Sequence, residues 1–302
     1  MPAIPYSRYF FGTLPWYSTL IVLGMALALL LASREEKRLG LRKDTAVDLA
    51  LWVIPCGIIG ARLYYVAFSW DVFAGDPLRI LRIWEGGLAV YGGVIGGLLA
   101  ALVFSRVKKI PLATLTDIMV PGLVLAQTIG RWGNYFNMEA YGAVITSPAW
   151  QFFPVGVLIP EVGGYVWHMA TFFYESMWNL GVFIALMCLR KRAFRRFDLT
   201  CWYFLLYGAG RFVIEGLRSD SLTVLGGFRV SQLLSAGMVL FALIWFARHV
   251  TRRGWLLAPV AAAVLCVLFA LLPLPLTLRH LLMSAAAILC GSLMYSQTDP
   301  EA

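Results

Sequence analysis

Nine stretches of about 20 mostly apolar residues recur along the 302-residue chain. A helix that crosses the hydrocarbon core of a bilayer needs about this length, and buried strands are much shorter. In hydrocarbon each backbone polar group must be paired within its own segment, so these stretches are predicted to be helices. They cover residues 15–33, 49–69, 86–105, 112–129, 172–190, 199–217, 229–247, 255–272 and 278–295. The pattern therefore predicts an all-α, polytopic transmembrane bundle with about nine spans.

Composition and charge agree with this class and predict its orientation. Hydrophobic residues make up 60% of the chain and charged residues 14%, whereas soluble domains carry about 25% charged residues. Sixteen of the 25 Lys and Arg residues lie in the loops 34–43, 106–109, 190–196 and 248–253, and seven lie in segments on the other side. Since basic loops stay in the cytoplasm, we expect the N-terminus outside and the C-terminus inside. The net charge of +9 then has a topological cause, and we expect no nucleic-acid binding.

The chain is expected to have two parts. Residues 1–248 would form a seven-span core, and residues 249–302 would add a C-terminal transmembrane hairpin with almost no polar signal within its spans. The first span is too long for the apolar core of a signal peptide, and no basic segment closely precedes it, so we expect it to be retained.

Neither the cysteines nor the histidines form a metal or nucleophile motif. Each of the five cysteines lies in or at the end of an apolar stretch, there is no C-x-x-C pair, and the three histidines are far apart. The cysteines are therefore expected to be small apolar residues of the bundle. We expect no metal site.

Two segments differ from plain spans and loops. The connection at 130–171 is long and rich in Trp, Tyr and Phe, which predicts a folded cap at the level of the lipid headgroups. The third span contains two overlapping G-x-x-x-G pairs, Gly92/Gly96 and Gly93/Gly97. Such pairs let helices approach closely, so they indicate helix packing, a role in admitting a lipid chain, or both.

The sixth span places ionisable residues on one helical face. Tyr207, Arg211, Glu215 and Arg218 follow one another at spacings of four, four and three residues. Charged groups inside a bilayer are costly and point to function by default. One interpretation is a structural ion pair between Arg211 and Glu215. The alternative is an anion site, because two arginines and one glutamate leave a positive charge.

Further polar residues converge on the same leaflet by topology alone. These residues are Tyr17, Arg62, Tyr91, Arg131, Asn134, Glu139 and Tyr141. An arginine fork matches phosphate geometry, so the set predicts a site for an anionic phospholipid headgroup on the outer side. These residues alone do not separate an enzyme from a lipid translocase or a non-catalytic lipid binder.

Three motifs in this set resemble those of the prolipoprotein diacylglyceryl transferase family. Residues 130–142 read G-R-W-G-N-Y-F-N-M-E-A-Y-G and are similar to the family's G-R-x-G-N-F-x-N-x-E signature and its trailing glycine. Residues 84–93 are similar to its G-G-x-x-x-H-G-G segment, and residues 207–218 to its R-F-x-x-E-x-x-R stretch. Tyr174-Glu175, Gly60-Ala61-Arg62 and Ser231-Gln232 are weaker matches.

The resemblance implies a bacterial cytoplasmic-membrane enzyme that is active at the outer face. Its partners would be phosphatidylglycerol, prolipoprotein signal peptides with a lipobox cysteine, and membrane lipid. The diacylglyceryl group would move to the cysteine thiol, a thioether would form, and glycerol phosphate would leave. No metal or organic cofactor is implied.

The resemblance also implies roles for residues. Arg131 and Arg211 would hold the lipid phosphate, and Glu215 would orient Arg211 or Arg218. The signature loop would be shaped by Asn134, Glu139 and Gly142, and the substrate pocket would be lined by Tyr17, Tyr207 and Arg62.

The chain departs from the family pattern in three places. The histidine often proposed as the base is Tyr91 here, and a neutral phenol, with a pKa of about 10, is a poor base for a thiol of about 8.5. Tyr91 either has a lowered pKa or only hydrogen-bonds the phosphate or the ester; we favour the second. Met169-Ala170 replaces a frequent His-Pro pair, and His168, one residue away, receives no role. The third departure is the extra hairpin at 255–295.

Overall fold

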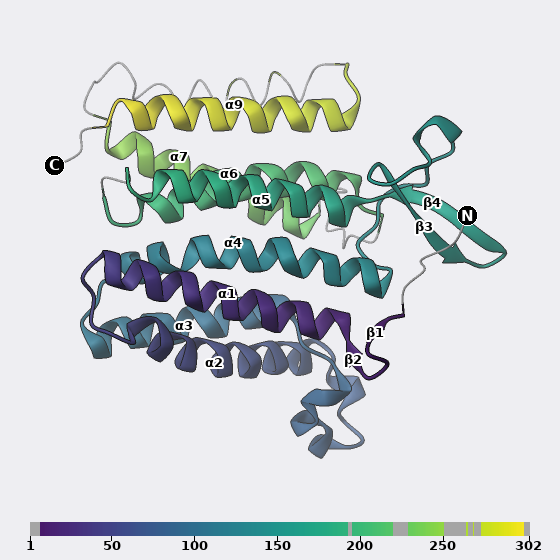
Figure 1. The fold of residues 1–302 in the computed structure, drawn as a ribbon, viewed down its shortest axis with the longest axis horizontal. Coiled ribbons are helices and arrows are strands. Elements are labelled where there is room, and N and C mark those ends of the chain that lie inside the picture. The colour runs from purple at the N-terminus through teal and green to yellow at the C-terminus, as the bar shows by residue number, and fades with distance from the viewer. Residues whose placement is uncertain are drawn as a thin grey trace. The chain divides into compact units, whose positions relative to one another are not determined.

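The computed structural model describes residues 7–192, 195–219, 229–250, 264, 268 and 273–298. Within them lie eight named α-helices and two short antiparallel hairpins (Figure 1). The helices are α1 (Trp16–Arg38), α2 (Thr45–Phe68), α3 (Val90–Lys108), α4 (Leu112–Asn137), α5 (Thr171–Leu189), α6 (Asp198–Leu217), α7 (Val230–Arg248) and α9 (Leu276–Ser296). The strands are β1 (Tyr9–Phe10), β2 (Leu14–Pro15), β3 (Gly156–Glu161) and β4 (Gly164–Met169).

Seven of these helices are long and apolar enough to cross a membrane, which confirms a multi-span helical protein. Among the described helices, α6 is the exception, because Arg211 and Glu215 lower its mean hydropathy. Almost all of the predicted span 255–272, with Cys266, lies outside the described residues.

Two helix boundaries differ from the sequence prediction for identifiable reasons. Helix α4 continues through Gly130 and Gly133 to Asn137, so the segment without helix begins only at Met138. The apolar stretch ends at residue 129, but the helix continues beyond it and tolerates the isolated glycines at a cost of about 1 kcal/mol each. Helix α3 begins at Val90, because Gly86 and Gly87 have φ angles of +89° and +73° and cannot be helical.

Contacts divide the chain into two compact units, residues 1–28 with 120–302 and residues 29–119. We call them the first and the second unit and describe each by itself. The boundary between them falls inside α1 and inside α4.

The core of the first unit surrounds α6, which packs against α5, α7 and α9 (Figure 1). Cys201 and Leu205 of α6 are fully buried there, together with Met294 of α9. The Ser284 hydroxyl of α9 also donates to the carbonyl of Ala209 at 3.0 Å. Helix α9 is thus an integral part of this core, and α6 is covered on several sides by other helices. This enclosure lowers the cost of the ionisable groups on α6, because they face protein and not lipid.

The segment after α4 folds into a small aromatic-rich cap, as its composition predicts. Strands β3 and β4 pair antiparallel, with Val157 opposite His168. Val157 and Ile159 of β3 are buried together with Phe172, and Trp132 packs edge-on against Phe172 with ring centroids 6.1 Å apart.

In the second unit, glycines let α2 and α3 approach closely. A Cβ atom on Gly60 would lie 2.5 Å from the carbonyl oxygen of Gly92 and 3.0 Å from Cα of Gly96. By contrast, a Cβ atom on Gly93 would meet nothing nearer than 3.6 Å. Of the two G-x-x-x-G pairs, Gly92/Gly96 therefore forms the close contact.

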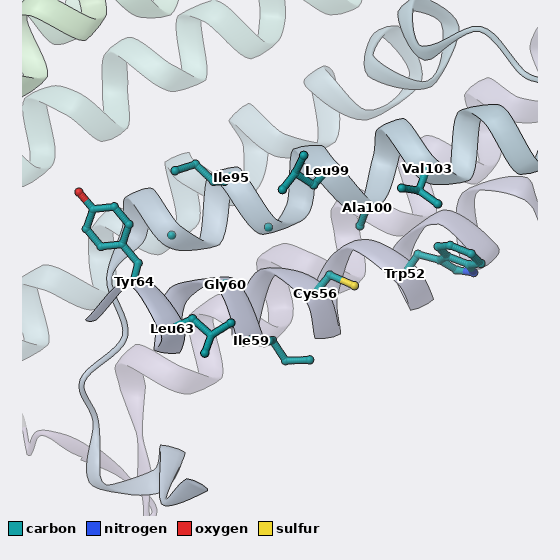
Figure 2. A pocket seen from close by; sticks show the side chains of 12 residues that line it. Trp52, Cys56, Ile59, Gly60, Leu63, Tyr64, Ile95, Leu99, Ala100 and Val103 are labelled. Carbon is teal, nitrogen blue, oxygen red and sulfur yellow. The ribbon is translucent and has the colours of Figure 1, made fainter. Parts of the chain in front are cut away.

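Beside this contact, α2 and α3 form an apolar groove of about 610 Å³. Figure 2 shows its aliphatic side chains along the two helices, with Trp52 near one end and Tyr64 near the other. Its lining residues are Trp52, Cys56, Ile59, Gly60, Leu63, Tyr64, Gly92, Ile95, Gly96, Leu99, Ala100 and Val103. None of these side chains is charged, so the groove offers no ionic chemistry.

Candidate functional site

The structure divides the twelve predicted site residues between the two units. Ten belong to the first unit: Tyr17, Arg131, Asn134, Glu139, Tyr141, Gly142, Tyr207, Arg211, Glu215 and Arg218. Arg62 and Tyr91 belong to the second unit.

Glu175 of α5 joins the two arginines of the predicted phosphate site. Its Oε1 lies 2.7 Å from Nη2 of Arg131 on α4, and its Oε2 lies 2.7 Å from Nη1 of Arg211 on α6. The glutamate is 2% exposed, so one buried carboxylate holds two guanidinium groups from two different helices. A buried charge is tolerated only when it is paired and hydrogen-bonded. Sequence reasoning did not assign Glu175 to the site; its only signals were a weak family match and its place in an apolar span.

Arg211 continues the ionic chain along α6. Its Nη2 lies 2.5 Å from Oε2 of Glu215, the i+4 neighbour that the sequence spacing predicted. Tyr207, one turn earlier on α6, stacks on Tyr203 with ring centroids 5.2 Å apart. Both interpretations of the α6 residues therefore have support. Arg211 forms ion pairs with Glu175 and Glu215, as a structural ion pair requires. It also shares Glu175 with Arg131, so two arginines lie together, as an anion site requires.

Asn134 links Arg131 to the beginning of the cap. Its side-chain oxygen accepts a 3.4 Å hydrogen bond from Nη1 of Arg131, and its amide nitrogen donates to Oε1 of Glu139 at 2.8 Å. Tyr17 of α1 packs against Gly133, where an added Cβ would lie 2.8 Å from its ring. One helical turn of α4 thus carries Arg131 and Asn134 side by side, with Glu139 completing a polar chain.

Gly142 and Arg218 meet through the backbone. They form an isolated antiparallel bridge, and a Cβ on Gly142 would lie 2.7 Å from the carbonyl oxygen of Leu217. Only glycine fits this close approach, which joins the signature segment to the end of α6. The Gly142 residue is held further by Met169, whose carbonyl accepts its N–H at 2.8 Å.

His168, to which the sequence assigned no role, also contacts this segment. Its ring is 4% exposed, with Nδ1 2.9 Å from the carbonyl oxygen of Gly142 and Nε2 2.8 Å from Oε1 of Glu161. Because a carbonyl can only accept, Nδ1 carries a proton. His168 thus supports the segment that carries Gly142.

In the second unit, Arg62 is buried against backbone. It is 5% exposed, and its guanidinium donates to carbonyl groups of the connection between α2 and α3. Tyr91 lies in the first turn of α3, with its ring centroid 6.5 Å from that of Tyr64 on α2.

This arrangement suits an anionic ligand better than a metal. A guanidinium has five N–H groups, more than the contacts above use on Arg131 or on Arg211, and its fork geometry matches a phosphate. Across the part of the chain that the structure describes, no group of three or more His, Cys, Asp or Glu residues could hold a metal ion.

Comparisons with known proteins identify the family. Residues 9–248 match the family model of the prolipoprotein diacylglyceryl transferases. Phosphatidylglycerol–prolipoprotein diacylglyceryl transferases from Listeria welshimeri, Enterococcus faecalis and Limosilactobacillus reuteri are 43%, 45% and 44% identical to it. The aligned segments cover 76%, 76% and 77% of this chain and 83%, 84% and 86% of those relatives. The resemblance read from the three motifs is confirmed: the chain belongs to the prolipoprotein diacylglyceryl transferase family.

Proposed function

We propose that Arg131 and Arg211, joined by Glu175, bind the lipid phosphate in the reaction that this chain catalyses. Family membership over most of the chain makes it a phosphatidylglycerol–prolipoprotein diacylglyceryl transferase. One observation carries the proposed site: two arginines from separate helices share one buried carboxylate, within the region that matches the family.

The reaction places its largest change of charge on the phosphate. A carbon–sulfur bond forms between the lipobox cysteine and the diacylglyceryl carbon as the bond from that carbon to the phosphate oxygen breaks. The thiol proton leaves with glycerol phosphate, whose second ionisation has a pKa near 6. A phosphodiester thus becomes a monoester with more charge on its oxygens. Two guanidinium groups aimed at that phosphate stabilise the departing oxygen more than the intact lipid, which is the requirement for catalysis.

Glu175 and Glu215 orient the arginines. A long, flexible side chain loses conformational entropy when it binds a ligand. Because the ion pairs already restrict the arginine rotamers, less entropy is lost when the phosphate binds. Glu175 engages one end of each guanidinium, and the remaining N–H groups are available to the phosphate. Asn134 and Glu139 hold the turn of α4 that carries Arg131, and Gly142 lets the segment pass close to Arg218. Tyr17 and Tyr207 line the lipid pocket.

For Tyr91 we propose the role of a hydrogen-bond donor to the substrate and not that of a base. The positive field of Arg131 and Arg211 favours the thiolate. A neutral phenol still carries its own proton near pH 7, and only its phenolate form could take a proton from a thiol. This role does not require Tyr91 to act as a base.

The enzyme works at the outer face of the bacterial cytoplasmic membrane. The distribution of Lys and Arg, sixteen in one set of loops and seven on the other side, supports an outer position for the N-terminus and for the α4–α5 connection. Its partners are phosphatidylglycerol and exported prolipoproteins that carry a lipobox cysteine.

A mass spectrum tests the activity and its acceptor. Purified protein is incubated with phosphatidylglycerol and a lipobox peptide that has either cysteine or alanine at the acceptor position. We expect a diacylglyceryl mass increase on the cysteine peptide alone. Bound phosphatidylglycerol without an increase on either peptide would contradict the transferase and support a non-catalytic lipid binder or translocase.

A further inference from the structure

The Arg62 guanidinium contacts five backbone carbonyl groups of a single connection. Nε donates to the carbonyl of Ile80 at 2.9 Å. The other four acceptors are the carbonyl oxygens of Gly86 and Gly87, at 2.6 and 3.1 Å from Nη1, and of Arg79 and Arg82, at 2.6 and 3.2 Å from Nη2. The guanidinium carbon also lies 5.1 Å from the ring centroid of Phe73, which is 2% exposed.

These contacts use the whole donor capacity of the side chain. A guanidinium has five N–H groups, and the structure gives the side chain five acceptors. None of those acceptors is a carboxylate. The nearby acidic residues pair with other arginines: Glu85 lies 2.7 Å from Arg79, and Asp76 lies 3.4 Å from Arg82. The Arg79 hydrogen bond lowers the pKa of the Glu85 carboxyl, which in turn raises the pKa of Arg79.

The connection is shaped around this side chain. It consists of three short 3₁₀ helices, η1 (Trp70–Val72), η2 (Pro77–Leu81) and η3 (Ile83–Glu85), followed by Gly86 and Gly87. A Cβ atom on Gly87 would lie 2.6 Å from Nη1 of Arg62. The carbonyls of Arg79 and Arg82 each accept a backbone N–H as well, from Arg82 and Glu85 at 3.1 and 3.2 Å. Arg62 adds a second donor to these two and supplies a donor to the carbonyls of Ile80, Gly86 and Gly87. Unpaired carbonyls are costly wherever water is excluded.

The same contacts determine where α3 begins. Gly86 and Gly87, whose carbonyls Arg62 holds, immediately precede the turn into that helix. The Ala89 amide donates to the carbonyl of Ala61, the residue next to Arg62, at 3.0 Å. Tyr91 follows two residues later.

We propose that Arg62 is a positioning residue: it folds the connection 69–89 and thereby places Tyr91, and it does not bind the lipid phosphate itself. The part of this inference that concerns turnover rests on the proposed function, whereas the part that concerns the connection does not. In this proposal Arg62 does not contact the substrate. It affects the reaction through the backbone of the connection, which positions Tyr91.

The test compares Arg62→Lys and Arg62→Gln with Arg79→Gln in the full-length protein, reconstituted with phosphatidylglycerol. Lysine keeps the charge but offers three donors without a planar fork, so it cannot satisfy five carbonyls. Arg79→Gln removes an exposed arginine from the same connection, where a surface ion pair contributes little. Two quantities are measured for each variant: amide hydrogen exchange across 79–89, and kcat and KM for phosphatidylglycerol.

We expect Arg62→Lys to accelerate exchange across 79–89 at least about tenfold, because charge-assisted hydrogen bonds are lost. Its kcat should fall about tenfold or more, with KM for phosphatidylglycerol within about twofold of the wild-type value. Arg79→Gln should change neither quantity. If Arg62→Gln fails to insert, Arg62→Lys alone carries the test.

Unchanged exchange in Arg62→Lys would overturn the proposal. A rise in KM that exceeds the fall in kcat would also overturn it, because direct binding of the lipid phosphate predicts that pattern. Failure of the proposed function is a different result, in which the unmodified protein transfers nothing; the exchange measurement is read without turnover and still decides the role of Arg62 in the connection.

Discussion

The carboxylate of Glu175 and the guanidinium of Arg211 form a 2.7 Å ion pair in which Glu175 is almost completely buried. The second oxygen of the same carboxylate contacts Arg131 at 2.7 Å. A single negative charge therefore sets the separation of two positive ones. Loss of that charge would leave two like charges facing each other in a region of low dielectric constant.

We expect Glu175→Gln to lower the transfer rate by about 10²-fold or more, because both guanidinium groups lose the charge that holds them in place and a misplacement of about 1 Å can cost about 10²-fold. Glu215→Gln is the matched comparison, because of Arg131 and Arg211 it is only Arg211 that Glu215 contacts. Initial rates on a lipobox peptide measure the difference, and size-exclusion chromatography checks that both variants remain monodisperse. Equal losses in the two variants would show that the shared carboxylate has no special role.

Replacement of Arg131 tests the phosphate contact directly. Arg131→Ala should reduce transfer by about 10²–10³-fold, the usual effect of removing a donor that stabilises transition-state charge. Arg131→Lys should recover only part of the rate, because an ammonium group cannot span Glu175 and a phosphate with a planar fork. Wild-type rates in the alanine variant would remove Arg131 from the site.

Tyr91→Phe separates two roles for the phenol. A hydrogen-bond donor to a charged group should cost about tenfold in rate when it is removed. A general base should cost about 10²–10⁴-fold. We expect the smaller loss, measured as kcat with saturating phosphatidylglycerol. Full activity would show that the hydroxyl is neither base nor donor.

Neighbouring glycines of α3 should respond differently to alanine. A Cβ on Gly92 would overlap the carbonyl oxygen of Gly60, whereas a Cβ on Gly93 would make ordinary contact with Ala61 at 3.7 Å. Gly92→Ala should therefore lower the free energy of unfolding by about 1–3 kcal/mol, and Gly93→Ala should leave it almost unchanged or raise it. Thermal unfolding in detergent compares the two. Similar shifts for both would mean that α2 and α3 do not pack through Gly92.

The helical class could be read from the chain because the hydrocarbon thickness sets the length of a span. Which residues of a helix make the close contacts, and where each helix ends, could not be predicted from the sequence as well. Both glycine pairs of α3 fit the same motif, and only the partner helix, with Gly60 facing Gly92, distinguishes them. The extension of α4 to Asn137 depends on packing of its last turns, for example Gly133 against Tyr17 and Trp132 against Phe172, which a local pattern does not contain.

Individual ion pairs of the candidate site were predictable from spacing only where both residues lie on one helix. The spacing of Arg211 and Glu215 is visible as an i,i+4 pair, and the structure contains that pair. Glu175 stands alone in its apolar span, and its contacts come from α4 and α6, so no local spacing reveals them. The partners of Arg62 could not be predicted either. The sequence shows only an arginine within a span, and this pattern is the same whether the arginine binds a phosphate or backbone carbonyls.

The bridge between Gly142 and Arg218 has a consequence for the order in which the protein is made. Arg131 and Gly142 leave the ribosome well before Glu175, Arg211 and Arg218 exist. The guanidinium of Arg131 must therefore wait, first for α5 and then for α6, before its ionic partners are complete. A nascent chain released before α6 has entered the membrane would carry the family signature without the charges that organise it. The proposed phosphate site is therefore complete only after α6 has been made.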